Sequence, residues 1–202
     1  MGRTSAFDRD DVIRAARDVF WARGYAETGV AELEAATGLK RSSIYHAFGS
    51  KKGLFEAVVA RYLDEVVRSR IGRLQQSDAG VEALELYIAE MRAAIASGTP
   101  RAQAGCLLLN AACAPVVDDD PDVRALVTAY TDELRAAIAA GVDSARPELS
   151  AGSRAALSEV CASLVIAALA VARVDPDAAD RSLEAVVTAV ASWDVGATPV
   201  YT

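Results

Sequence analysis

The sequence has few of the residues that build metal centres or disulfide frameworks. It contains three cysteines, Cys106, Cys113 and Cys161, and a single histidine, His46. No cysteine pair has the Cys-x-x-Cys spacing of a zinc site, and one histidine leaves little from which to assemble a ligand set. An odd number of cysteines also argues against a disulfide framework. We therefore expect no metal site and no structural disulfide.

Long apolar runs and an export signal are also missing. No window reaches about 18 apolar residues, the length typical of a membrane-spanning helix. The richest run, residues 163–172, fits a buried core helix better. The first residues, MGRTSAFDRDD, become acidic where a signal peptide needs an apolar stretch. These absences predict a cytoplasmic protein without a membrane partner.

Catalytic motifs are missing as well. The sequence has no GxSxG, HExxH, GxxxxGK[ST] or Rossmann glycine pattern. Ser-His or Cys-His catalysis would have to use His46, which lies far in sequence from the cysteines. We therefore expect that the protein is not an enzyme and uses no cofactor. A helical scaffold that binds no DNA is a further alternative, and it leaves the clustering of basic residues near the N-terminus unexplained.

What the chain does have is ample core material and an uneven charge distribution. Its 202 residues are 52% hydrophobic, and its net charge is -7. Residues 1–55 hold nine Lys or Arg against seven Asp or Glu, a balance of +2, whereas residues 56–202 carry a balance of -9. The two parts therefore face different partners. We predict one domain over 1–55 and a second over 56–202.

Apolar residues recur at helical spacing throughout, and no strand-like alternation occurs. The sequence predicts an all-α protein with about nine helices, in which Asp8, Thr28 and Ser50 cap the first, second and fourth. The predicted helices cover residues 8–23, 29–37, 40–48, 51–76, 81–97, 105–117, 122–142, 152–174 and 177–193. Only the turn 38–40 separates the second helix from the third, which is the pattern of a helix-turn-helix.

The third helix has the chemistry of a DNA-reading helix. The second helix of a helix-turn-helix lies in the major groove, where its N-terminal residues reach base edges. Here these residues are Lys40, Arg41, Ser42 and Ser43. Arg or Lys donates to the acceptors of guanine, and Ser donates or accepts. The alternative is that the basic residues form an ordinary solvated helix face.

Residues around this helix are suited to binding phosphate. Tyr45 and His46 are expected to point toward its flanks. Lys51 and Lys52 begin the fourth helix, whose free N–H groups and positive dipole end favour an anion. Thr28 offers the same arrangement at the second helix. Such contacts position a protein on DNA, while the reading helix specifies the sequence.

The stretch FWARGYAETGVAELEAATGLKRSSIYHAFGSKKGLF resembles the N-terminal domain of the tetracycline-repressor (TetR) family of bacterial transcriptional regulators. The resemblance runs over residues 7–62 and is carried by Gly24-Tyr25, Thr28, Ala36-x-Gly38, Tyr45-x-x-Phe48 and Ser50-Lys51. It implies that Thr28, Tyr45, His46 and Lys51 contact the DNA backbone, and that Arg41, Ser42 and Ser43 lie nearest the bases. Lys40 departs from the small capping residue that many relatives carry, and we expect it to contact phosphate instead.

The resemblance also implies a homodimer on a palindromic operator. Family members pair through their last two long helices, which correspond here to residues 152–174 and 177–193. These segments carry apolar stripes, formed by Leu157, Cys161, Leu164, Ala168 and Val171 and by Leu183, Val186, Val187 and Val190. Such stripes would also suit an internal core.

The remaining helices are expected to enclose a pocket for a small, largely apolar effector that releases the repressor from DNA. Residues 105–112, GCLLLNAA, resemble a stretch that borders the pocket in a subset of the family. The candidate lining residues are Tyr62, Tyr87, Met91, Leu108, Asn110 and Tyr130, each of which could equally be simple core. Asn110 is the most informative, because an amide in an apolar helix needs a partner in the protein or in a ligand.

Cys106 suggests a second mode of regulation. A cysteine near a helix N-terminus can form a reactive thiolate, which would make the same DNA-binding scaffold a redox or electrophile sensor. The alternative is ordinary burial, since a free cysteine behaves as a small hydrophobe. Labelling of the native protein with a thiol reagent distinguishes the two.

Overall fold

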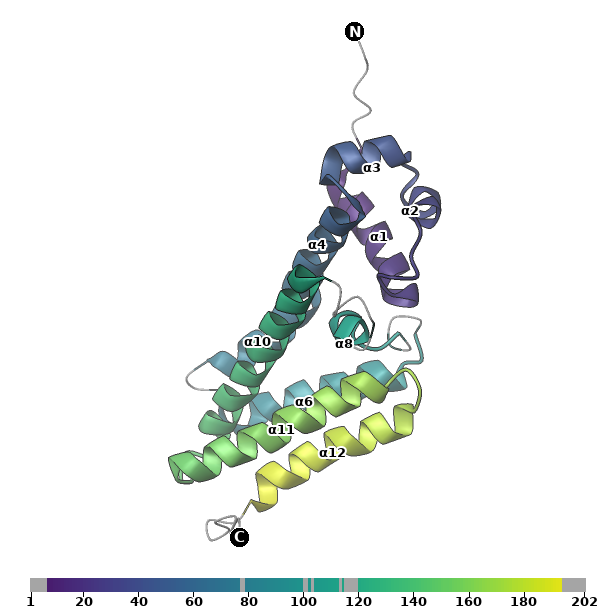
Figure 1. Ribbon diagram of the computed structural model, residues 1–202. Coiled ribbons are helices and arrows are strands. Elements are labelled where there is room, and N and C mark those ends of the chain that lie inside the picture. The colour runs from purple at the N-terminus through teal and green to yellow at the C-terminus, as the bar shows by residue number, and fades with distance from the viewer. Residues whose placement is uncertain are drawn as a thin grey trace.

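The computed structural model describes residues 7–76, 79–99, 102, 104–112, 114 and 120–193. Within these ranges every regular element is helical, and nine helical segments follow one another (Figure 1). They are α1 (Arg9–Arg23), α2 (Val30–Thr37), α3 (Arg41–Phe48), α4 (Lys51–Tyr62), α6 (Gly80–Ala96), α8 (Leu107–Ala112), α10 (Pro121–Ala145), α11 (Ala151–Val171) and α12 (Pro176–Ser192). The predicted all-α class is confirmed.

The fourth segment is longer than α4 alone. It continues through the π-helical turn η1 (Leu63–Arg68), the short α5 (Ser69–Ile71) and the 3-10 turn η2 (Gly72–Gln75). The sequence predicted this helix over 51–76 but not its π-helical turn. Such turns are rare and are frequent at functional sites.

Most helix ends agree with the predicted signals. Asp8 caps α1 by accepting the N–H of Asp10 at 2.8 Å, and Ser50 caps α4 by accepting the N–H of Gly53 at 3.0 Å. The helix predicted over 105–117 extends over 107–112 in the described residues, and positions 113 and 115–117 lie outside them.

The cap predicted for α2 was wrong. Gly29 is the N-cap, and its N–H donates to the carboxylate of Glu32 at 2.6 Å. Thr28 lies one residue earlier, where its hydroxyl donates to the Gly24 carbonyl at 2.6 Å. The hydroxyl therefore closes the loop between α1 and α2 instead of capping the helix.

The first three helices and the start of α4 share an aromatic core. The Phe20 and Phe55 rings meet edge to face at 5.1 Å between centroids, and the Tyr25 ring lies 4.8 Å from that of Phe55. Ile44 of α3 and Leu33 of α2 are fully buried in the same cluster. This core fixes α3 at the end of the molecule that carries the N-terminus (Figure 1).

The other helices form a second body. α10, α11, α12 and α6 pack on one another, and α8 lies against α10 and α11 (Figure 1). The long segment that begins with α4 packs on α1 at its start and on α10 further along. Because the predicted boundary after residue 55 falls inside this helix, the division into 1–55 and 56–202 stays a proposal.

The apolar stripes predicted on α11 and α12 point into this body. Leu157 and Cys161 of α11 and Leu183 of α12 are fully buried within the chain. The internal-core alternative accounts for these buried side chains, whereas Leu164, Val171 and Val187 are half-buried, and pairing through the two helices stays a prediction. Within the described part of the chain, α11 is also long and apolar enough to cross a membrane by length and composition, with 33% of its most apolar window buried.

Candidate nucleic-acid interface

The reading helix α3 is held by two buried side chains and by one carboxylate. Ile44 and Phe48, four residues apart on one side of the helix, pack inward. The carboxylate of Glu34, on α2, accepts the N–H of Arg41 at 2.7 Å. Lys40 occupies the N-cap position but makes no side-chain capping bond. Glu34 thus supplies the cap that a small residue at position 40 would provide, and the Lys40 side chain stays exposed.

The three predicted base-reading residues lie on the first turn of α3. Arg41 and Ser42 are exposed, and Ser43 is half-buried. The guanidinium of Arg41 lies 5.0 Å from the centroid of the Tyr45 ring, a cation–π distance. This stacking pre-orders a long side chain, which reduces the entropy lost when it binds a base.

Two of the predicted phosphate contacts are well placed beside α3. His46 is exposed on its outer side. The ammonium of Lys51 lies 4.6 Å from the centroid of the Tyr25 ring and 3.5 Å from the carbonyl oxygen of Ala26. Partial burial lowers the pKa of Lys51 from its ordinary value. The ring and the carbonyl therefore hold this cation at the α4 N-terminus.

Two other predicted phosphate contacts are engaged within the protein. The ammonium of Lys52 donates to the carboxylates of Asp120, at 3.0 Å, and Asp122, at the start of α10. These bonds raise the pKa of Lys52 well above its ordinary value. Thr28 has no exposed surface, and its hydroxyl is bonded to Gly24. The bonds of Lys52 join the start of α4 to the start of α10.

A cavity of about 290 Å³ lies where the N-terminal helices meet the second body. Arg17 and Trp21 of α1 line it together with Tyr62, Val66, Arg70, Met91, Ala94, Ile95, Ser97, Thr99, Ala102, Gly105, Leu169 and Ala172. The indole N–H of Trp21 donates to the Gly105 carbonyl at 2.7 Å. The Trp21 ring also meets the Tyr62 ring edge to face at 5.1 Å.

The predicted pocket residues divide into two groups. Tyr62 and Met91 line the cavity, and both also line a smaller neighbouring hollow, where Tyr87 and Tyr130 join them. Leu108 is fully buried and lines neither space. The amide of Asn110 donates to the Ala104 carbonyl at 2.6 Å, so its partner lies within the protein.

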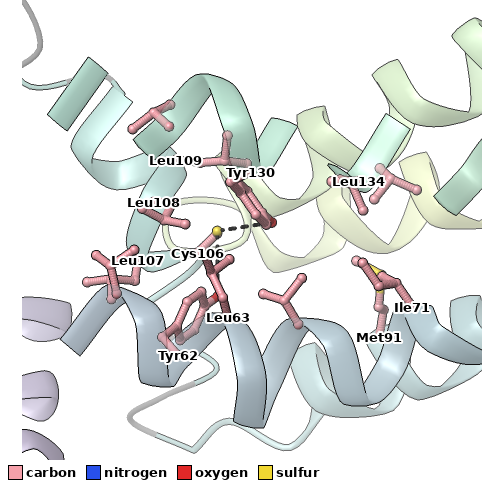
Figure 2. Packing of buried hydrophobic residues seen from close by; sticks show 14 of the residues in the cluster. Tyr62, Leu63, Ile71, Met91, Cys106, Leu107, Leu108, Leu109, Tyr130 and Leu134 are labelled. Carbon is pink, nitrogen blue, oxygen red and sulfur yellow. Dashed lines mark hydrogen bonds between the residues drawn. The ribbon is translucent and has the colours of Figure 1, made fainter. Parts of the chain in front are cut away.

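Cys106 lies between two tyrosine hydroxyls, as Figure 2 shows. Its sulfur is 3.6 Å from the Tyr62 hydroxyl and 3.4 Å from the Tyr130 hydroxyl. Burial raises the pKa of both tyrosines. Because Cys106 is only 1% exposed, the thiol has almost no surface that a reagent could approach. The geometry favours the interpretation of Cys106 as a packed core residue.

Sequence reasoning missed the part that α1 plays in the cavity. Arg17 and Trp21 belong to the helix-turn-helix domain, and nothing in their spacing indicates that they face the second body. Arg70 was also missed, although a signal existed. It follows Tyr62 and Val66 at intervals of four, so the three residues lie on one side of the same helical segment.

These features together define a class of protein. A basic, exposed reading helix is mounted on a bundle of short helices, a larger all-helical body is attached to this bundle, and a cavity lies where the two meet. This is the architecture of a helix-turn-helix transcriptional regulator with a regulatory domain.

Comparisons with known proteins identify the family. Residues 12–58 match the family model of bacterial regulatory proteins, tetR family. A cysteine-substituted form of the TetR-family regulator CifR, solved with 26 bp of double-strand operator DNA, is 31% identical with a TM-score of 0.71; the match covers 96% of this chain and 100% of that one. The chain belongs to the TetR family of transcriptional regulators. These regulators are not enzymes, as the sequence predicted.

Curated relatives match over part of their length. The HTH-type transcriptional repressor ComR of Escherichia coli is 37% identical over 124 residues, which are 60% of this chain and 57% of that repressor. The uncharacterized regulator YezE of Bacillus subtilis is 29% identical over 59% of this chain and 60% of its own. The matched part of the chain thus spans less than two thirds of the length of each of these relatives.

Proposed function

We propose that this protein is a cytoplasmic, DNA-binding transcriptional repressor. It binds a palindromic operator as a homodimer and leaves it when a small effector occupies the cavity. The observation that carries this proposal is the cavity itself, because α1 and the second body both contribute to its wall. An effector there touches the DNA-binding domain and the regulatory domain at once.

The surface of α3 supports the DNA-binding part of the proposal. We assign base reading to Arg41, Ser42 and Ser43, and phosphate binding to Lys40, Tyr45, His46 and Lys51. Lys52 is bonded to α10, and it could reach phosphate only after those ion pairs open. The likeness to CifR, which was solved on operator DNA, supports the same assignment.

The outward side of α11 supports the homodimer. It presents Ala155, Val160, Ser163 and Ala167, all of them exposed, and Val160 is 39% exposed. Small side chains allow two helices to approach closely, and an exposed apolar face on a soluble chain marks an interaction surface. Two copies joined through such a surface would present reading helices one DNA turn apart, roughly 34 Å, which a palindromic operator matches.

Release from the operator requires that the effector bind one conformation of the protein more tightly than the other. A ligand shifts the equilibrium between two conformations only by the difference in its affinity for them, typically about 1 to 3 kcal/mol. The hydrogen bond from Trp21 to Gly105 crosses between α1 and the loop before α8. An effector that repacks this contact would rotate α1 and change the spacing of the two reading helices.

The test is a selection of binding sites from sheared genomic DNA with the purified protein at two salt concentrations. Enrichment of one palindromic sequence, with affinity that falls steeply with salt, is the expected result. Weak, salt-sensitive retention of all fragments alike would contradict the proposal and favour a solvated basic face.

A further inference from the structure

The cavity contains one cation that no described residue neutralises. Four arginines follow one another along the segment from α4 to η2. Arg61 pairs with Asp10 and Glu65, Arg68 with Asp64 and Glu133, and Arg73 with Glu90, at 2.5 to 2.8 Å. Arg70 lines both the cavity and the adjoining hollow and has no ion pair with any residue that the structure describes. The unpaired arginine is the one that faces the enclosed space.

The walls around Arg70 hold no compensating charge. Among the described residues that line the cavity and the hollow, none is Asp or Glu. Arg17 is the other cation there, but its guanidinium already lies 3.2 Å from Asp18 and 3.3 Å from Glu65. Taking a charge partly out of water without a counter-ion costs free energy. An anion that entered the cavity would recover that cost at Arg70.

A second polar group beside Arg70 also lacks a partner. Tyr87 is only 5% exposed and lines the hollow together with Arg70. Its hydroxyl makes no hydrogen bond to any described residue, which leaves it free to donate to a ligand in the hollow. Burial raises the pKa of Tyr87, so the hydroxyl stays protonated and is available as a donor.

Most of the remaining wall is apolar, and Arg17, Ser97 and Thr99 are its other polar side chains. Val66, Met91, Ile95, Leu169 and Ala172 surround the cavity. At about 290 Å³ it lies at the small end of ligand pockets, which range over roughly 300–1,000 Å³. One free guanidinium fork fits the two oxygens of a carboxylate. A phosphate dianion would need a second free cation, and none is present in the described lining.

We propose that the effector is a small organic acid, whose carboxylate binds Arg70 and the Tyr87 hydroxyl while its apolar body fills the space beside Met91 and Leu169. This inference rests on the proposed function, and it sharpens the expectation of a largely apolar effector by adding one negative charge. The indole of Trp21, which also lines the cavity, would contact the apolar end and carry the signal to α1.

The test measures occupancy directly in the full-length protein. Trp193→Phe leaves Trp21 as the sole tryptophan, so its fluorescence reports ligand in the cavity. The probes are benzoate, phenylacetate, hexanoate and octanoate, each beside its uncharged primary amide, together with hexyl phosphate. We expect at least one carboxylate to bind about tenfold more tightly than its amide and than the phosphate, because only the carboxylate matches the single free guanidinium in both charge and geometry.

Three variants in the Trp193→Phe background test which side chain binds the carboxylate. Arg70→Gln should weaken the best carboxylate at least about tenfold and leave its amide unchanged, and Tyr87→Phe should weaken it about fivefold. Arg68→Gln is the matched control, because Arg68 lies on the same segment but is paired outside the cavity. Unchanged thermal unfolding of Arg70→Gln without ligand confirms that it folds.

Three outcomes would overturn the inference: no carboxylate binds at millimolar concentration, amides or phosphate bind as tightly, or Arg70→Gln and Arg68→Gln lose affinity equally. The site selection on genomic DNA is independent of all probes. A protein that selects an operator but fails these tests keeps the proposed function and loses the organic-acid effector. A protein that binds carboxylates but selects no operator loses the proposed function instead.

Discussion

The surface of α3 and the cavity beneath α1 both present arginine, but in opposite surroundings. Arg41 stands exposed on the first turn of α3, with its guanidinium over the Tyr45 ring. Arg70 is half-buried among apolar side chains. An exposed cation is solvated and adds to a long-range field, which suits a polyanion such as DNA. A half-buried cation without an ion-pair partner suits one small anion, because the anion can take the place of the water molecules that solvate the cation.

The comparison shows that residue type alone does not assign a role. Lys51 and Lys52 are adjacent in sequence and both begin α4, yet only Lys51 remains beside the reading helix. Lys52 is bonded to the two carboxylates at the start of α10. The direction in which each side chain leaves the helix decides its partner, and that direction differs by about 100° between neighbours.

The largest expected effect comes from Gly53→Ala, which breaks the support of α3. A Cβ at position 53 would lie 2.0 Å from the carbonyl oxygen of Phe48, so α3 and α4 would have to separate. We expect the free energy of unfolding to fall by about 2 to 3 kcal/mol. Urea denaturation measures it.

Gly72→Ala is the control for that measurement. Position 72 lies on the same segment, but a Cβ there would have no packing neighbour within 4 Å. Here the helical backbone favours alanine over glycine, so the free energy of unfolding should rise by about 0.5 to 1 kcal/mol. Equal effects of the two substitutions would contradict the close approach of α4 to the end of α3.

Arg41→Ala should change which sequence is preferred. Removing one base-reading side chain lowers discrimination at a single base pair by about 1 to 3 kcal/mol. Competition binding between the selected operator and its single-base variants measures the change. Equal losses on operator and random DNA would show that Arg41 contacts phosphate and does not read a base.

Lys51→Ala and Lys52→Ala sharpen the contrast between the adjacent lysines. Lys51→Ala should weaken binding to every DNA sequence and reduce the salt slope by about one. Lys52→Ala should leave the slope nearly unchanged, because its ammonium is occupied by Asp120 and Asp122. Binding isotherms at four salt concentrations give both slopes, and a larger change for Lys52→Ala would reverse the assignment.

The smallest effect is expected at Cys106. Reaction of the native protein with a thiol reagent near neutral pH should leave Cys106 unlabelled over minutes, because the sulfur is buried between Tyr62 and Tyr130. Mass spectrometry of the digested protein locates any label. Fast labelling of Cys106, followed by loss of operator binding, would support the alternative of a redox or electrophile sensor.

The helix-turn-helix was predictable because its signals are local. The stops at Gly24 and Gly38, the Ser50 cap and the inward pair Ile44 and Phe48 each depend on residues a few positions apart. The Thr28 cap was predicted wrongly because Gly29 can cap the same helix when Glu32 reaches back to it. A Thr28 cap would accept an N–H of the first helical turn, whereas Glu32 accepts the N–H of Gly29, and only the loop geometry selects one arrangement.

The cavity could be predicted only in part. Tyr62 and Met91 were among the candidate lining residues, whereas Arg17 and Trp21 come from another domain and carry no local signal for this site. Asn110 was a candidate lining residue whose amide needed a partner in the protein or in a ligand, and the structure gives it the nearby Ala104 carbonyl. The sequence shows that a buried amide needs a partner but not which one it finds.

By itself the sequence determined the all-helical class, the reading helix and the basic residues around it, because helix periodicity, caps and turns are set by neighbouring residues. The tertiary structure alone decided which of two adjacent lysines is bonded within the protein, which side chains of the apolar stripes are buried, and that Arg70 faces a cavity without a counter-ion among the described residues. These outcomes depend on the packing of helices far apart in the chain, and that packing sets which charges are enclosed and which are paired.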